Sequence, residues 1–188
     1  MEVLETRVIS TAIQSLSPNQ DMRPDPEDIS LAVIHCISLP EGEFGGNLVH
    51  QLFTNDLPTN LPEALVDLRS LRVSSHLLID RKGVITQFVP FHRRAWHAGV
   101  STWRHRPNCN DYSIGIELEG SPELNFEEIQ YSVLLEVLDA VIAEYPKLSW
   151  EAIVGHAEIS PGRKVDPGPR FDWHRVLSGL STLSDAAS

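Results

Sequence analysis

The chain has 188 residues, of which 15 are Lys or Arg and 26 are Asp or Glu, so its formal net charge is −11. This length predicts one domain, which we expect to span residues 1–188 with a core from about residue 22 to about residue 180. The acidic balance argues against nucleic acid and membrane as partners, because both attract clusters of Lys and Arg. The sequence offers no sign of an obligate protein partner.

The N-terminus has no basic start followed by an apolar run, and no stretch is long and apolar enough to span a bilayer. Two cysteines, Cys36 and Cys109, are too few for a disulfide scaffold. We expect free thiols in a reducing compartment, with a single bridge as the alternative. These features predict a protein that stays in the cytoplasm.

Five short runs predict β-strands. They cover Leu31–His35, Ser75–Ile79, Val84–Val89, Ser113–Leu118 and Ala152–Val154. A turn with a glycine at residues 80–83 separates the second run from the third and predicts a hairpin. The first thirty residues hold several prolines among polar residues and predict little regular structure. Residues 55–71 form a long connection with about one helical turn, which suits a binding lid or a plain surface loop.

The range Phe126–Tyr145 carries apolar residues at helical spacing, with Asn125 as the expected N-cap and Pro146 as the terminator. Shorter helices are expected over Leu48–Phe53 and Trp173–Leu180. Helices and strands alternate along the chain. The sequence therefore predicts an α/β fold with a central mixed β-sheet flanked by α-helices.

Three residues of zinc-binding type occur where a predicted strand ends or a loop is rigid. His35 ends the first strand, His156 follows the last one, and Asp166 lies in a loop rich in proline and glycine at residues 160–169. Two imidazoles and one carboxylate make a facial set of ligands that leaves one position on zinc for water. The alternative is that Asp166 caps a turn and the histidines are structural.

Two glutamates follow each other on one face of a predicted strand. Glu117 and Glu119 are two residues apart, so their side chains point the same way. A carboxylate beside a metal can take the proton of an attacking water, but the pattern does not separate the two residues, and a solvated strand face is the alternative. Lys164 precedes Asp166 by two residues and suits oxyanion stabilisation, or simple solvation.

Five segments in unbroken order from about Met22 to Trp173 resemble the cytoplasmic anhydromuramoyl-peptide amidases of the AmpD type. The segments are VIHCISLPEGEFGG from Val33, RVSSHLLIDRKGVITQFVPF from Arg72, RAWHAGVS from Arg94, CNDYSIGIELEG from Cys109 and GHAEISPGRKVDPGPRFDW from Gly155. The resemblance implies a fold similar to that of T7 lysozyme and the peptidoglycan-recognition proteins.

The resemblance also implies a zinc ion as cofactor and a role for each residue of the site. It places zinc on His35, His156 and Asp166, general-base work on Glu117 and oxyanion stabilisation on Lys164. The implied substrate is an anhydromuropeptide. Hydrolysis of the amide between 1,6-anhydro-N-acetylmuramic acid and L-alanine would serve peptidoglycan recycling and influence β-lactamase induction.

The same resemblance implies that Trp96 lines the sugar site, and that Arg72 and Arg163 meet carboxylates of the stem peptide. Position 36 is a cysteine where the family usually has asparagine. We expect His76 in the core or behind a ligand, and His97 to line the pocket at most. Two other functions stay open: an amidase that acts on intact peptidoglycan, and a muropeptide-binding module that does not cut.

Overall fold

A six-stranded sheet forms the centre of the protein in the computed structural model, which describes residues 1–186 and the side chains of residues 1–179. The strands are β1 (Ile13–Gln14), β3 (Leu31–Ile37), β4 (Leu77–Ile79), β5 (Ile85–Gln87), β9 (Ser113–Glu119) and β10 (Ile153–Gly155). Their order is β1-β5-β4-β9-β3-β10. The β4–β5 pair is antiparallel and the other pairs are parallel, so the sheet is mixed, as predicted.

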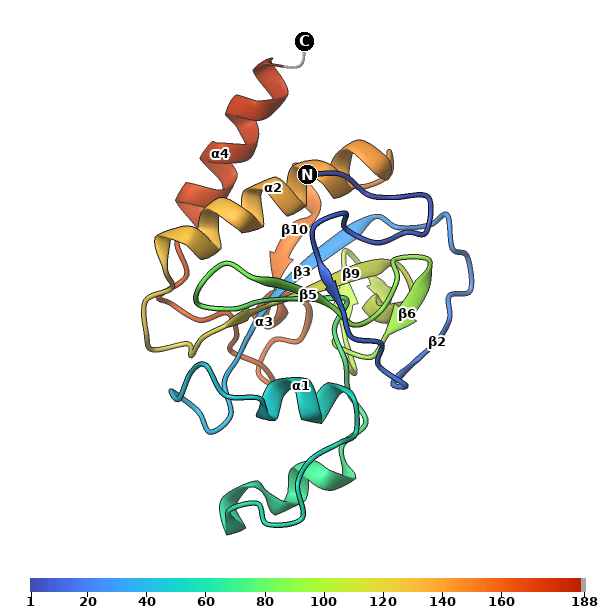
Figure 1. Ribbon diagram of the computed structural model, residues 1–188. Helices are drawn as coiled ribbons and strands as arrows, with labels where there is room; N and C mark the ends of the chain where they lie inside the picture. Colours follow the sequence, from blue (N-terminus) through green and yellow to red (C-terminus); the bar gives the residue numbers. More distant parts are fainter. Residues whose placement is uncertain (187–188) are drawn as a thin grey trace.

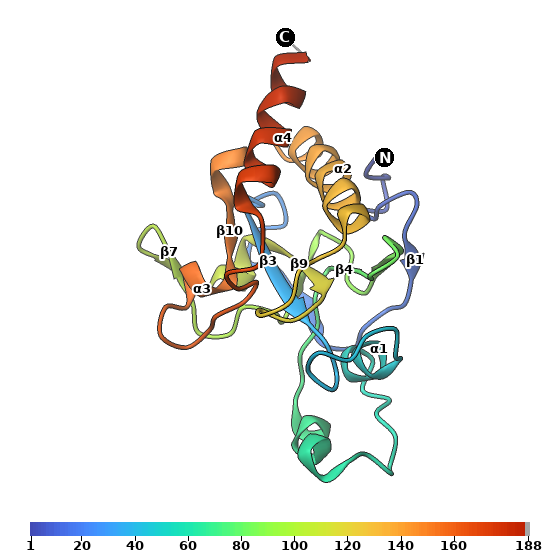
Figure 2. The same ribbon diagram turned by 90° about the vertical axis from the view of Figure 1, so that its left-hand side faces the viewer.

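Helices flank this sheet on both faces. They are α1 (Leu48–Phe53), α2 (Glu128–Glu144), α3 (His156–Ile159) and α4 (Trp173–Ala186), with shorter 3-10 turns η1 (Glu63–Ser70), η2 (Cys109–Asp111) and η3 (Trp150–Ala152). Helices α2 and α4 pack together on one side, whereas α1 and η1 lie on the other side (Figures 1 and 2). The arrangement confirms the predicted α/β fold.

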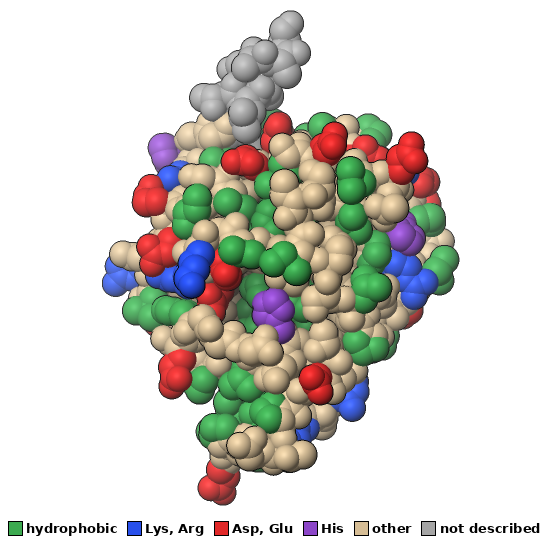
Figure 3. All heavy atoms as spheres, in the orientation of Figure 1, with side chains coloured by type: hydrophobic (Ala, Val, Ile, Leu, Met, Phe, Trp, Pro, Cys, Tyr) green, Lys and Arg blue, Asp and Glu red, His purple; other side chains and the backbone are tan. Residues whose placement is uncertain are grey.

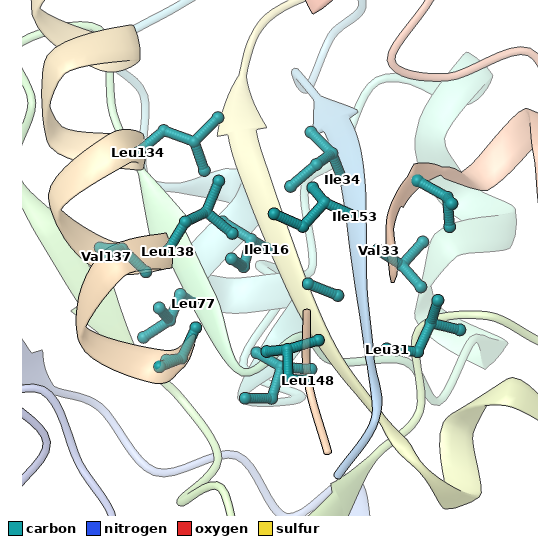
Figure 4. Packing of buried hydrophobic residues seen from close by; sticks show 14 of the residues in the cluster. Leu31, Val33, Ile34, Leu77, Ile116, Leu134, Val137, Leu138, Leu148 and Ile153 are labelled. Atoms are coloured by element: carbon teal, nitrogen blue, oxygen red, sulfur yellow. The ribbon is translucent and has the colours of Figure 1, made fainter. Parts of the chain in front are cut away.

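Alternation along the strands divides the side chains between the two faces of the sheet. Leu77 of β4 belongs to the larger core, whereas its neighbour Leu78 packs with residues of α1 on the opposite face. Figure 4 shows Leu138 of α2 close to Leu77 and Ile116. Since Ile116 of β9 faces α2, the next residue, Glu117, faces the side of α1.

The predicted strands all lie in the sheet, with shifts of one or two residues at their ends. Residues 80–84 join β4 to β5 in the predicted hairpin, where Gly83 has a positive φ of 80°. Strand β3 runs two residues beyond His35, because β9 pairs with all seven of its residues. His35 therefore lies inside a strand and not at its end, which corrects the prediction.

Helix α2 begins at Glu128, so the predicted cap at Asn125 is wrong. The N-cap is Glu127, whose backbone N–H donates to Oε1 of Gln130 at 3.0 Å. This capping box satisfies the free backbone donors at the start of the helix. The helix ends two residues before Pro146, as that proline predicts.

The first thirty residues hold more structure than their composition predicts. Strand β1 forms one edge of the main sheet, and β2 (Gln20–Met22) pairs antiparallel with β6 (Arg93–Ala95). A second small ladder joins β7 (Thr102–Trp103) to β8 (Arg106–Pro107). Ile9 is buried in the core and so ties the N-terminal segment to the sheet.

The connection between α1 and β4 projects as a lobe that carries η1, which is longer than the single turn expected (Figures 1 and 2). Hydrophobic side chains gather on this lobe in Figure 3. Leu65 and Leu68 of η1 line a cleft that also contains Asp166 and Lys164. The lobe thus borders the predicted site.

Helix α1 coincides with its predicted range, whereas α4 continues beyond the predicted end at Leu180 to Ala186. Over residues 1–186, the length and apolarity that a membrane-crossing helix requires are not found in any helix.

Candidate metal centre

His35 and Glu117 lie side by side on neighbouring strands. Strands β3 and β9 are parallel, and their register pairs His35 directly with Glu117. Residues paired in this way present their side chains to the same face of the sheet. Both side chains are almost out of solvent, with residue exposures of 2% and 8%.

Strand β10 and the loop after α3 bring the other two predicted ligands to this place. Strand β10 pairs in parallel with β3, and His156 follows it as the first residue of α3. The main-chain carbonyl of Asp166 accepts a hydrogen bond from Ala157 N at 2.9 Å. This bond holds the loop at residues 160–169 against α3, so the Asp166 side chain reaches the histidines.

Three side-chain atoms converge at this point. The Nδ1 atoms of His35 and His156 lie 2.9 Å apart, and Oδ2 of Asp166 lies 3.1 Å and 3.0 Å from them. Ligand atoms bonded to tetrahedral zinc at about 2.0–2.2 Å lie about 3.3–3.6 Å apart, which is close to the observed triangle. The three residues therefore form a group that can hold a metal ion.

The surroundings hold His35 and Asp166 in the protonation states that a metal requires. Burial lowers the pKa of His35 to about 4, although the hydrogen bond with Asp166 opposes that shift. Burial by itself would raise the pKa of Asp166, but hydrogen bonds with His156 and His35 outweigh it and keep that pKa below its ordinary value. At neutral pH, His35 is therefore neutral and Asp166 is ionised.

Cys36 lines the cleft beside the ligands but is not part of the ligand group. Its Sγ lies 3.6 Å from the carbonyl oxygen of Pro167. Burial raises the pKa of the Cys36 thiol, and the charge of Glu117 raises it further. Zinc binds the thiolate form, which is disfavoured here. Cys36 and Cys109 are both free thiols, as predicted.

The structure separates the two glutamates that share a strand face. Both carboxylate oxygens of Glu119 have hydrogen-bond partners. They accept from the backbone N–H groups of Gly45 at 2.6 Å and Arg81 at 3.1 Å. Glu117 lines the cleft with the three ligands, and its buried Oε2 has no hydrogen-bond partner. The free oxygen makes Glu117 the carboxylate that can work as a base.

Burial raises the pKa of Glu117 well above its ordinary value, and the charge of Asp166 adds to this shift, whereas Lys164 opposes it. The folded state therefore favours the protonated form of Glu117. Stability from this group is complete below pH about 4.5 and falls as the pH rises toward the raised pKa.

We expect Glu117→Gln to raise the melting temperature of the metal-free protein, because glutamine has no charge to bury. The gain should be small near pH 5 and larger at pH 8. Thermal unfolding across this pH range measures the gain in melting temperature. The exposed Glu123→Gln is the control, and its effect on the melting temperature should not change with pH. A gain that shrinks with rising pH would contradict the burial argument.

Gly168 controls the path of the loop that carries Asp166. It has a positive φ of 87°, and a Cβ there would lie 2.5 Å from Cα of Pro122. Gly162, in the same loop, has a φ of 76° but no atom within 4 Å of such a Cβ. Both glycines have a left-handed backbone, but only at Gly168 would a Cβ clash with a neighbouring residue.

We expect Gly162→Ala to cost about 1–2 kcal/mol of stability, from the left-handed backbone alone. Gly168→Ala adds a clash worth about 1–3 kcal/mol and should also weaken metal binding, since the Asp166 carboxylate moves with the loop. Urea unfolding of the metal-free variants and a zinc titration measure both effects. Equal losses in the two variants would show that the contact with Pro122 is unimportant.

Two basic side chains of the loop at residues 160–169 have different surroundings. Lys164 is exposed and lines the cleft together with the three ligands and Glu117. Arg163 lines the adjoining cleft under Leu65 and Leu68, and its Nη2 donates to the carbonyl oxygens of Ala98 at 2.6 Å and Val100 at 2.8 Å. Arg163 thus braces the chain at residues 98–100.

The other two predicted substrate residues do not line the cleft that contains the three ligands. Trp96 is half-buried, and its backbone N–H donates to Oγ of Ser74, a cleft residue, at 3.0 Å. Arg72 is exposed and lines a neighbouring hollow under the lobe, where its Nη1 donates to the carbonyl oxygens of Arg69 and Leu71. Their predicted roles stay predictions.

The sequence did not predict the contacts behind the two ligand histidines. Nε2 of His35 lies 2.9 Å from Nδ1 of His97, and Nε2 of His156 lies 3.1 Å from the carbonyl oxygen of Ala98. His97 does line the cleft, as predicted, but it also contacts a ligand. His76 is fully buried, and its Nδ1 accepts from Gly115 N at 3.0 Å.

Comparison with known proteins places the chain in a family. The profile of the N-acetylmuramoyl-L-alanine amidases, Amidase_2, matches residues 25–169, so the chain belongs to this family. The 1,6-anhydro-N-acetylmuramyl-L-alanine amidase AmpD of Haemophilus influenzae is 48% identical over 177 residues, which cover 94% of this chain and 96% of that protein.

Solved structures agree with this membership. The crystal structure of a selenomethionine AmpD derivative matches with a TM-score of 0.90 and 47% identity, over 94% of this chain and 98% of the other. The amidase AmiD from E. coli, solved with anhydro-N-acetylmuramic acid-L-Ala-D-gamma-Glu-L-Lys, matches with a TM-score of 0.60 and 30% identity, over 94% of this chain and 62% of the other. The fold is therefore that of the AmpD-type amidases.

Proposed function

We propose that this protein hydrolyses the amide bond between anhydro-N-acetylmuramic acid and L-alanine in muropeptides, with a zinc ion on His35, His156 and Asp166. The observation that carries the proposal is the convergence of three ligand atoms beside the unpartnered carboxylate oxygen of Glu117. The names of the AmpD relatives and the peptide bound to AmiD support this substrate. We place the reaction in the cytoplasm, in peptidoglycan recycling, with an indirect influence on β-lactamase induction.

Glu117 and Lys164 have different tasks in this reaction. Bound zinc supplies Lewis acidity, which polarises the scissile carbonyl and makes water nucleophilic near neutral pH. Glu117 accepts the proton of the attacking water and passes it to the leaving amine of L-alanine. Lys164 stabilises the negative charge on the former carbonyl oxygen.

The substrate contacts are proposed on weaker grounds. Trp96 suits the sugar ring, since an aromatic face packs well against it. Arg72 and Arg163 suit stem-peptide carboxylates, because guanidinium matches carboxylate geometry. Nη2 of Arg163 is committed to the carbonyls of Ala98 and Val100. Nη1 and Nε of Arg163 would therefore make the contact with a substrate carboxylate.

The test is hydrolysis of a defined anhydromuropeptide by zinc-loaded protein, with and without a chelator. We expect release of the free peptide, loss of release with the chelator, and recovery when zinc is returned. No release by fully loaded protein would refute the proposal. Tight muropeptide binding without cleavage would then favour a recognition module.

A wall amidase is the second candidate, because the bond named by the family, N-acetylmuramoyl-L-alanine, also joins sugar to peptide in intact peptidoglycan. It would use the same site on intact peptidoglycan outside the cytoplasm. Comparison of rates on purified sacculi and on soluble anhydromuropeptide separates the two. A clear preference for sacculi would replace the recycling function by this one.

A further inference from the structure

Both ligand histidines are supported from behind by one dipeptide. The outer nitrogen of His35 meets the ring of His97, and the outer nitrogen of His156 meets the carbonyl of the next residue, Ala98. We propose that the segment His97–Ala98, clamped by Asn110, positions the metal centre. The proposal rests on the proposed function in one respect, namely that the three ligands bind a metal.

His97 supplies an acceptor for the first ligand. A metal on Nδ1 of His35 leaves the proton on Nε2, which then donates to Nδ1 of His97 at 2.9 Å. His97 must then carry its own proton on Nε2, where it meets Oγ of Ser113, a fully buried residue, at 3.0 Å. The chain of hydrogen bonds fixes the tautomers of both rings.

The packing of the His97 ring is equally restricted. A Cβ at Gly115 would lie 2.5 Å from Cγ of His97, so the ring rests on the bare backbone of β9. Gly115 is two residues before Glu117 on the same strand. Strand β9 therefore positions both the His97 ring behind His35 and the proposed base, Glu117.

Asn110 holds the backbone of the dipeptide. Its Oδ1 accepts hydrogen bonds from both consecutive N–H groups, from His97 at 3.1 Å and from Ala98 at 2.8 Å. Asn110 itself lies in η2, three residues before β9 begins. On the opposite side, Nη2 of Arg163 donates to the Ala98 carbonyl at 2.6 Å. One amide oxygen thus controls the partners of both ligand histidines.

These contacts have a predictable effect on metal affinity. Outer partners orient a ligating imidazole, and their loss typically weakens metal binding by about 10–100-fold. His97 and Asn110 act through His35 and His156 and are positioning residues. Zinc dissociation constants, measured by competition with a chromophoric chelator, therefore report on them without any assay of hydrolysis.

The first pair of variants tests the acceptor at His97. We expect His97→Phe to weaken zinc binding by about 10–100-fold, because a phenyl ring fills the space but accepts no hydrogen bond. His97→Asn should retain most of the affinity, since its amide oxygen is three bonds from Cα, like Nδ1. His174→Phe, at an exposed position of α4, is the matched control and should bind as wild type does.

The second pair tests the clamp. Asn110→Leu keeps the shape of the side chain but removes the acceptor, so we expect a loss of about 10–100-fold in zinc affinity. Asn110→Asp keeps an oxygen that can accept both N–H groups and should bind much more tightly than Asn110→Leu. The exposed Asn125→Leu is the control. Circular dichroism of the metal-free proteins checks that each variant is folded.

The outcomes separate this inference from the proposed function. If wild type binds zinc tightly and His97→Phe and Asn110→Leu bind equally well, the clamp is refuted and the amidase proposal stands. If Asn110→Asp loses as much affinity as Asn110→Leu, the acceptor role is refuted. If wild type itself binds no zinc, the metal site fails, and both proposals fail with it.

Discussion

Glu117→Gln is expected to reduce kcat on anhydromuropeptide by about 100- to 10,000-fold while zinc content stays at that of wild type. Glutamine keeps the size of the side chain but can neither accept the proton of water nor deliver it to the leaving amine. Glu117 is outside the triangle of ligand atoms, so the metal should remain bound. Peptide release and zinc content, measured on the same preparation, test both halves of the prediction.

Glu119→Gln is the matched comparison, because it lies on the same strand face. Its carboxylate accepts backbone hydrogen bonds from Gly45 and Arg81, and glutamine can satisfy one of them at most without turning a donor toward the other. We expect lower stability and a kcat near that of wild type. A large loss of kcat in Glu119→Gln with little loss in Glu117→Gln would reverse the assignment.

Asp166→Ala is expected to weaken zinc affinity by more than about 100-fold, since loss of an outer partner alone costs about 10–100-fold. Two imidazoles remain, which is one protein ligand fewer than catalytic zinc sites use. The fold should persist, because the main-chain carbonyl of Asp166 holds the loop to Ala157. Hydrolysis at stoichiometric zinc should be lost with the metal.

Competition with a chelator measures the affinity, and a zinc titration of the hydrolysis rate shows whether activity returns at excess metal. The exposed Asp139→Ala on α2 removes the same group far from the ligands and should change neither quantity. Unchanged zinc binding in a folded Asp166→Ala protein would remove Asp166 from the ligand set and leave the metal site without its carboxylate.

Local patterns in the sequence were sufficient for most of the fold. The apolar runs and the glycine turn predicted the strands around His35 and the β4–β5 hairpin, since strand periodicity and turn chemistry are local properties. The cap of α2 was placed two residues early, because asparagine is a preferred N-cap residue by type, whereas the hydrogen bond between Glu127 and Gln130 is seen only in the folded helix. The pairing of β1 with β5 and the burial of Ile9 depend on distant segments, so the polar N-terminal composition concealed them.

For the site, the sequence supplied the residue types and the resemblance supplied their roles. Spacing pointed to His35, His156 and Asp166 as a facial set, but it could not choose between Glu117 and Glu119. Strand alternation puts the two glutamates on one face, and only their partners distinguish them. Glu119 is satisfied by backbone groups that the fold brings to it, whereas Oε2 of Glu117 is left free in the cleft.

The support behind the metal centre was decided by tertiary structure alone. His35 is 62 residues from His97 and 121 residues from His156 in the chain, so no local pattern relates them. The parallel register of β3 with β9 and β10, together with η2, brings these segments to one point. Sequence by itself determined which side chains could bind metal and move protons; packing determined which of them meet, because hydrogen bonds depend on distances that only the folded chain defines.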